Sequence, residues 1–162
     1  MVEQIRSFDL ARKYFNRIVY IDPTLSKSFT PTINPLECRL KTPRELDIQT
    51  NQIVRALEEM LPDAKLSLTM RAIIKPCIYT LLSLHTCTLE DLQAFLGDTA
   101  QTLLERGKIS PVSTYRQFFN NERNKPMYKR TKQSIYTKIQ SLLNSQVFYN
   151  MTIGRSTVNI ER

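Results

Sequence analysis

The sequence predicts a mainly α-helical protein, a multi-helix bundle preceded by one short β-strand. Three observations support this fold class. A long apolar stretch at residues 66–84 has helical spacing, and several shorter amphipathic segments with the same period flank it. A single run of β-branched and aromatic residues, at 17–21, is typical of a buried strand. The length of 162 residues suits one domain with a substantial core.

The stretch 66–84 is predicted to be the central helix of the bundle. Its apolar residues recur at helical spacing: Leu66, Met70, Ile74, Cys77, Ile78, Leu81 and Leu82. Ile73 widens the apolar arc to about half of the helix circumference. A surface helix needs a narrower stripe, so we expect neighbours on several sides, namely helices at 47–61, 89–96 and 127–145.

The N-terminal part, residues 1–45, combines three predicted segments. A helix at 3–15 is followed by the strand at 17–21, which ends at Asp22-Pro23. Nothing nearby in the sequence supplies partner strands for it. The connector at 22–45 contains four prolines, which favour an ordered extended loop over a flexible linker. We interpret residues 1–45 as the edge of an α/β core that lies elsewhere.

Residues 46–146 form the predicted helical bundle, and local signals mark its elements. Thr88 and Asp91 predict an N-terminal capping box for helix 89–96, and Gly97 predicts its C-terminal cap. A short helix through Leu103 and Leu104 is expected to end at Gly107.

The last predicted elements follow a proline. Ser110-Pro111 is expected to open a helix that presents three aromatic residues, Tyr115, Phe118 and Phe119. Residues 120–126 predict a turn, and 127–145 predict the last long helix. The tail at 147–162 is compatible with a loop or with short extended pieces that return toward the core.

No catalytic motif occurs in the sequence, so we expect no enzyme activity and no cofactor in this chain. There is no Gly-rich phosphate loop and no nucleophile elbow. His85 is the single histidine, and the three cysteines are too widely spaced for a zinc site or a disulfide framework. No run of 18 uncharged apolar residues occurs, so we expect no membrane span, and the N-terminal stretch lacks the apolar core of a signal peptide. A cytoplasmic protein with reduced cysteines is the expectation.

The positive charge is concentrated in the C-terminal part. The net charge is +8, and residues 105–162 contain 11 of the 23 Lys and Arg but only 3 of the 15 Asp and Glu. The candidate contacts for a nucleic acid or an acidic partner are Arg116, Arg123, Lys125, Lys129, Arg130, Lys132 and Lys138. Two interpretations stay open: a polyanion-binding surface, or a solvated basic face that aids solubility.

The helical wheel qualifies this basic segment. Lys129 and Arg130 lie on the polar side of the predicted helix, whereas Lys132 and Lys138 flank its apolar stripe on opposite sides. Tyr136 and Gln133 lie among the cations, where an aromatic ring can stack on an exposed base. Tyr128 falls in the apolar stripe and is predicted to pack.

The order of several short motifs resembles a known family. Ile18-Val19-Tyr20-Ile21-Asp22-Pro23 precedes Ile33-Asn34-Pro35-Leu36-Glu37, and a basic last helix leads into Ile153-Gly154-Arg155-Ser156-Thr157. This order resembles the middle portion of HerA/FtsK-type motor ATPases, specifically conjugative coupling proteins and related type IV secretion ATPases. In that family a helical region is inserted into the nucleotide-binding core between the Walker A and Walker B elements.

The resemblance implies a part of a motor rather than a complete one. Neither Walker element is present in the sequence, so ATP and Mg²⁺ are expected only for a full-length relative. The implied partners are DNA or a DNA-processing protein of a transfer apparatus, and the remainder of the ATPase. Three hypotheses follow: a substrate- or partner-recognition module, a stand-alone basic helical protein that binds nucleic acid, and a purely structural insert.

Overall fold

The computed structural model describes residues 30–37, 42–60 and 66–157. The described elements are, in chain order, α3 (Pro43–Met60), α4 (Leu68–Leu82), α5 (Leu89–Leu96), α6 (Gln101–Lys108), α7 (Ser113–Gln117), the π-helix η2 (Phe118–Glu122), α8 (Pro126–Leu143) and α9 (Gln146–Thr152). This part of the chain is helical and contains no strand, which confirms the mainly α prediction. The predicted helix 3–15, strand 17–21 and Cys38 lie outside the described residues.

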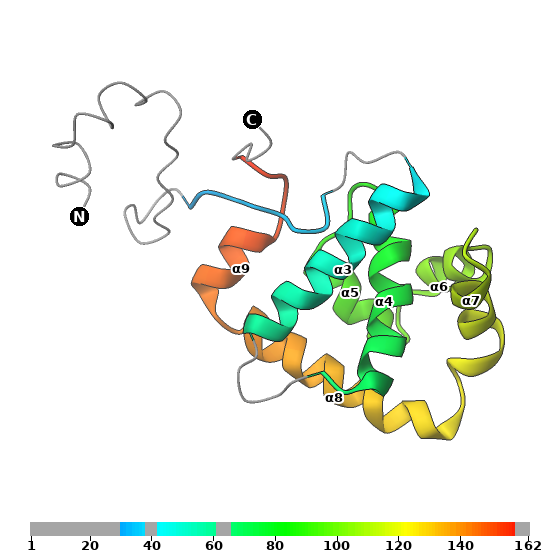
Figure 1. The fold of residues 1–162 in the computed structure, drawn as a ribbon. Coiled ribbons are helices and arrows are strands. Elements are labelled where there is room, and N and C mark those ends of the chain that lie inside the picture. The colour runs from blue at the N-terminus through cyan, green and yellow to red at the C-terminus, as the bar shows by residue number, and fades with distance from the viewer. Residues whose placement is uncertain (1–29, 38–41, 61–65, 158–162) are drawn as a thin grey trace, which may run out of the picture.

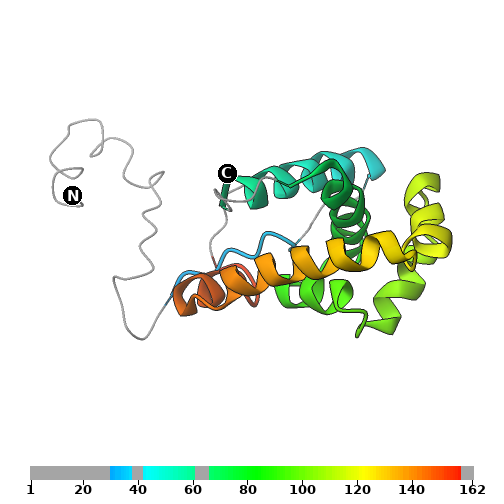
Figure 2. The same cartoon turned by 90° about the horizontal axis from the view of Figure 1, so that it is seen from below.

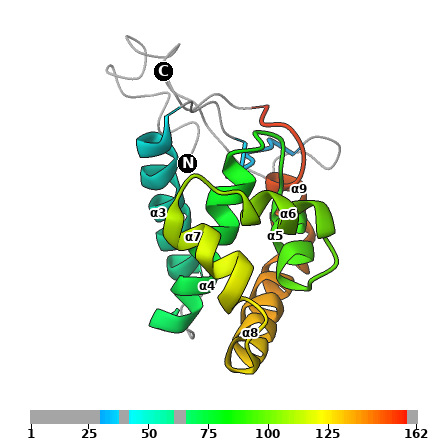
Figure 3. The ribbon, with the colours of Figure 1, turned by 90° about the vertical axis from the view of Figure 1, so that its right-hand side faces the viewer.

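Helix α4 is the centre of the bundle, as the sequence predicts. Ser67 is its N-cap, and its hydroxyl accepts a hydrogen bond from the Met70 amide at 3.2 Å. Almost every residue from Ile73 to Leu82 is buried. The reason is visible in Figures 1 and 3, where α3 covers one side of α4 while α5 and α6 cover the other and α8 crosses below.

Helix α3 begins earlier than the predicted residue 47. Thr42 and Glu45 form a capping box: the Thr42 amide donates to Glu45 Oε2 at 3.0 Å, and the Glu45 amide donates to Thr42 Oγ1 at 3.2 Å. Pro43 occupies the first helical position, where its missing N–H costs nothing. The fourth connector proline is therefore part of the helix and does not precede it.

The capping box of α5 is confirmed, whereas its C-terminal end differs in detail from the expectation. Asp91 Oδ2 accepts the Thr88 amide hydrogen bond at 2.7 Å. Gly97 is the C-cap, but its φ is −76°, so it does not use the left-handed conformation that glycine favours. That conformation falls one residue later, at Asp98, with φ of 60°. The chain reversal after α5 therefore depends on an aspartate.

The region between α6 and α8 is more helical than predicted. The helix expected at Pro111 begins at Ser113, and the predicted turn shortens to residues 123–125 because η2 continues through Glu122. The π-helix turns Phe118 and Phe119 into the core, where Phe119 stacks on Phe95 with ring centroids 5.3 Å apart.

We expect Gly107→Ala to lower the free energy of unfolding by about 1–3 kcal/mol, as overpacking does. A Cβ on Gly107 would lie 2.6 Å from Cδ2 of Phe119, whose ring is held by Phe95. The gain in helix propensity, about 1 kcal/mol, does not offset this clash. Urea unfolding measures the change. Gly97→Ala is the control, since its Cβ would meet its nearest atom, in Tyr136, at 3.3 Å. Equal stability of the two variants would contradict the packing at Phe119.

The tail after residue 146 is partly helical, which corrects the expectation of a loop or extended pieces. Ser145 caps α9 through a hydrogen bond from the Phe148 amide, and Phe148 and Tyr149 pack against the core. Once buried contacts are available, a short segment can become helical although its sequence lacks a strong helical period.

The two ends of the described chain lie side by side (Figure 1). The Ile33 amide donates to the Met151 carbonyl at 2.6 Å, and the Thr157 amide donates to the Thr32 carbonyl at 2.9 Å. The Asn34 amide donates to Ser156 Oγ at 3.0 Å. Residues 30–37 and 151–157 therefore form a paired base from which the bundle starts and to which it returns.

Candidate nucleic-acid interface

The seven predicted cations do not form one surface. Arg116 is on α7, Arg123 and Lys125 lie in the turn before α8, and Lys129, Arg130, Lys132 and Lys138 are on α8. Helix α8 runs along the lower edge of the bundle in Figure 1 and lies in front in Figure 2, so one of its sides faces outward. The position of each cation around this helix decides whether it can meet a ligand.

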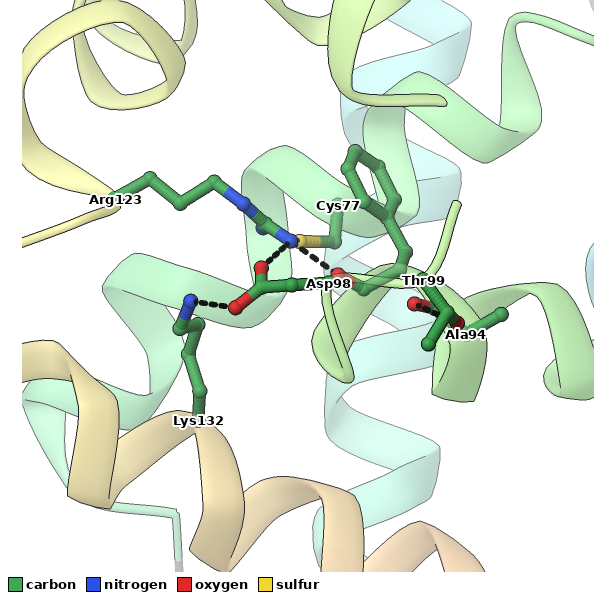
Figure 4. Close-up of polar contacts among 7 residues, drawn as sticks. Cys77, Ala94, Asp98, Thr99, Arg123 and Lys132 are labelled. Atoms are coloured by element: carbon green, nitrogen blue, oxygen red, sulfur yellow. Dashed lines mark hydrogen bonds and ion pairs between the residues drawn. The ribbon is translucent and has the colours of Figure 1, made fainter. Parts of the chain in front are cut away.

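Arg123 and Lys132 are buried, which removes them from the predicted interface. Their side chains are 1% and 7% exposed, and both bind the carboxylate of Asp98. Arg123 Nη2 donates to Asp98 Oδ1 at 2.6 Å and Lys132 Nζ donates to Oδ2 at 2.5 Å (Figure 4). Buried cations require such a partner because desolvation of an unpaired charge is costly. These two residues hold α5, the turn before α8 and α8 together.

Aromatic rings and a thiol complete the surroundings of Arg123. Its guanidinium lies 4.9 Å from the centre of the Phe95 ring and also donates to the Phe95 carbonyl. Arg123 Nη1 lies 3.9 Å from Cys77 Sγ. Burial nevertheless raises the pKa of the Cys77 thiol to about 11, although the nearby Arg123 charge acts in the opposite direction. Cys77 is therefore a protonated core residue at neutral pH and not a nucleophile.

Two further cations are held by neighbouring groups. Arg116 Nη1 donates to the Ser110 carbonyl at 2.9 Å, although the side chain is exposed. Lys125 Nζ lies 2.7 Å from Glu122 Oε1, and this hydrogen bond raises the pKa of the lysine. An ion pair with a protein carboxylate competes with any phosphate for the same charge. Lys138 is partly buried in the second half of α8.

Lys129 and Arg130 are the two predicted cations that are exposed and whose side chains make neither a hydrogen bond nor an ion pair among the described residues. Neither makes an ion pair within residues 30–37, 42–60 and 66–157. They line a shallow hollow of about 550 Å³ on the outer side of α8, together with Pro126, Gln133, Ser134 and Thr137. We call these six residues the α8 basic face. Its hollow has no acidic lining residue, and its polar side chains can donate hydrogen bonds to an anion.

The helix terminus adds to the positive potential of the α8 basic face. Lys129 and Arg130 lie at the N-terminal end of α8, where the helix dipole is positive. The N-cap is Lys125, whose side chain caps no amide, and the first turn contains no acidic residue. Nothing in this turn neutralises the dipole, so it acts in the same direction as the two side chains.

A second hollow has mixed charge and is less suited to a polyanion. It lies between α4, α7–η2 and the start of α8, and its lining includes Arg71, Lys75 and Glu122. Arg71 Nε is 2.7 Å from Glu58 Oε1, so that cation already has a protein partner.

Sequence reasoning missed three of the residues that define the α8 basic face or its supporting contacts. Asp98 carries no local signal that it binds two cations distant in sequence. Ser134 and Thr137 are not among the predicted contacts, although their spacing of four and seven residues from Arg130 places all three on one side of a helix. Helical spacing from the exposed pair could have found these two hydroxyls.

Metal and membrane features add nothing to this candidate site. Over the described ranges, no group of three or more His, Cys, Asp or Glu side chains could hold a metal ion. None of the helices in the same ranges has both the length and the apolar character needed to cross a membrane.

Comparison of the chain with protein-family models, with curated proteins and with solved structures gives no match. The resemblance to HerA/FtsK-type ATPases therefore depends on the short sequence motifs alone.

Proposed function

We propose that this chain is a non-catalytic recognition module that binds DNA through the α8 basic face. The supporting observation is the exposed, unpaired pair of cations, Lys129 and Arg130, in a hollow without carboxylates. Phosphate oxygens provide the negative charge and the acceptors that these side chains lack among the described residues. In this proposal the module belongs to a DNA-translocating motor of a type IV secretion or conjugative transfer apparatus.

The paired base of the bundle supports the proposal of an inserted module. Asn34 and Glu37 belong to one motif of the resemblance, and Ser156 belongs to another, 119 residues after Glu37. The Ser156 amide donates to Glu37 Oε2 at 2.6 Å. A domain whose ends meet can be inserted into another domain without displacing its core. ATP and Mg²⁺ would then bind in the remainder of a cytoplasmic motor and not in this module.

The first test is the salt dependence of DNA binding. For duplex DNA the slope of log K against log salt is about −0.9 for each phosphate contact. Lys129→Ala plus Arg130→Ala should therefore flatten the slope by about 1.8. Lys129→Glu plus Arg130→Glu should abolish binding at low salt. Fluorescence anisotropy with a labelled duplex oligonucleotide measures both the slope and the affinity.

A matched pair of charge reversals controls for net charge. Arg44 on α3 and Arg106 on α6 are exposed and make no ion pair within the described chain. Arg44→Glu plus Arg106→Glu changes the net charge by the same amount but leaves α8 intact. If this control weakens binding as much as the α8 variant, the contact is non-local and the α8 basic face is not the site.

The stand-alone and structural alternatives make different predictions. A stand-alone nucleic-acid-binding protein would bind DNA equally well, but its coding sequence would have no in-frame phosphate-loop motif upstream. A purely structural insert would bind no DNA at low salt. If no DNA is bound, binding of an acidic peptide would then test for an acidic protein partner.

A further inference from the structure

The α8 basic face borders another hollow, which lies between α5 and α8 and is distinct from the mixed-charge hollow beside α4. This hollow of about 520 Å³ is lined by Glu90, Gln93, Ala94, Gly97, Thr99, Gln133 and Tyr136. Gln133 lines both hollows, so they are neighbours along α8. One extended ligand can therefore occupy both.

Tyr136 presents a partly exposed side chain to the hollow between α5 and α8. The ring packs against the core, and Gly97 allows a close approach, since a Cβ on Gly97 would lie 3.3 Å from Cε2 of Tyr136. The Tyr136 hydroxyl makes no hydrogen bond to another described residue. The part of the ring that lines the hollow offers a platform for a planar base.

The spacing along α8 aligns the ring with the cations. Lys129, Gln133 and Tyr136 follow one another by four and three residues, so they lie on one side of the helix. Lys129 and Tyr136 are two turns apart, or about 10 Å along the axis. A cation that can bind phosphate and a ring that can stack on a base thus lie in line, with the side-chain amide of Gln133 between them.

The charges of the two hollows differ in a way that orients a nucleic acid. Glu90 lines the hollow of Tyr136, and its Oε1 atom accepts a hydrogen bond from the Tyr149 hydroxyl at 2.8 Å. A carboxylate repels phosphate, whereas it can accept hydrogen bonds from the N–H groups on the edge of an unpaired base. The backbone of a ligand is therefore favoured at Lys129 and Arg130, and a base is favoured at Tyr136.

We infer that the DNA ligand is single-stranded, with its phosphates on the α8 basic face and one unpaired base stacked on Tyr136 in the hollow between α5 and α8. The inference rests on the proposed DNA-binding function and specifies its substrate. Bases in a duplex are stacked within the helix, so only a single strand can place one against a side chain. Duplex DNA would meet the cations alone.

The test compares a thymidine oligonucleotide with the same strand annealed to its complement, by fluorescence anisotropy at low salt. We expect Tyr136→Ala to weaken single-strand binding about tenfold, within the range for loss of one stacked base. Tyr136→Phe should retain the wild-type affinity because it keeps the ring. Duplex binding should change by less than about twofold in both variants, because it depends on phosphate contacts.

Folding of each variant is checked by circular dichroism, and Tyr136→Leu replaces Tyr136→Ala if the latter unfolds. If single-strand binding requires Lys129 and Arg130 but is unchanged in the Ala and Leu variants, the stacking inference is overturned and the proposed function stands. If the wild-type protein binds the duplex more tightly than the single strand, the stacking inference is likewise overturned and the proposed function stands. Absence of binding to either DNA at low salt overturns both.

Discussion

Replacing Asp98 with alanine is expected to lower the free energy of unfolding by about 3 kcal/mol, the lower end of the range for breaking a buried ion pair. Arg123 and Lys132 both depend on this carboxylate, and their side chains are 1% and 7% exposed. Arg123 cannot escape by losing its proton. The lower end applies because the side chain of Asp98 is 51% exposed, so water can fill part of the gap. Urea unfolding measures the loss.

Two companion variants separate charge from backbone strain. Asp98 has φ of 60°, a conformation that glycine adopts freely and alanine does not. Asp98→Gly therefore removes the charge without the strain, and its loss of stability reports the charge alone. Glu105→Ala breaks the exposed Glu105–Lys108 pair at 2.8 Å and should cost at most about 0.5 kcal/mol. A cost for Asp98→Gly no larger than that of Glu105→Ala would show that the buried cluster does not stabilise the fold.

Ile74→Asp is expected to unfold the bundle at 25 °C. Ile74 is 1% exposed in the middle of α4, where its apolar contacts would be lost and an ionised carboxylate would be desolvated. The effective penalty for burying an unpaired ion is several kcal/mol. Added to about 2–5 kcal/mol for the lost side chain, it is comparable to the whole stability of a domain, about 5–15 kcal/mol. Loss of the far-UV circular dichroism signal measures this outcome.

The same substitution at Leu68 is the control. Leu68 is the first residue of α4 and is 84% exposed. Leu68→Asp places a negative charge at the positive end of the helix dipole, which should leave stability unchanged or raise it by about 0.3–1 kcal/mol. A folded Ile74→Asp variant, as stable as Leu68→Asp, would contradict the central position of α4.

Helices were predictable where one local pattern determines them. The wide apolar arc of residues 66–84 predicted a helix with neighbours on several sides, and α3, α5, α6 and α8 surround α4. The capping residues of α5 were predictable for the same reason, because a capping box involves residues only three apart. Helix α9 was not predictable, since its stability comes from contacts with the core that local sequence does not encode.

The candidate site, like the fold, has some features that local sequence predicts and others that only the tertiary structure sets. The sequence by itself determined that positive charge gathers after residue 105 and that Lys129 and Arg130 lie on the polar side of a helix. Only the tertiary structure decided that Arg123 and Lys132 belong to the interior. The carboxylate that pairs with them is at Asp98, 25 and 34 residues away. Whether a cation is available to a ligand depends on its desolvation and its partner, and both are set by residues distant in sequence.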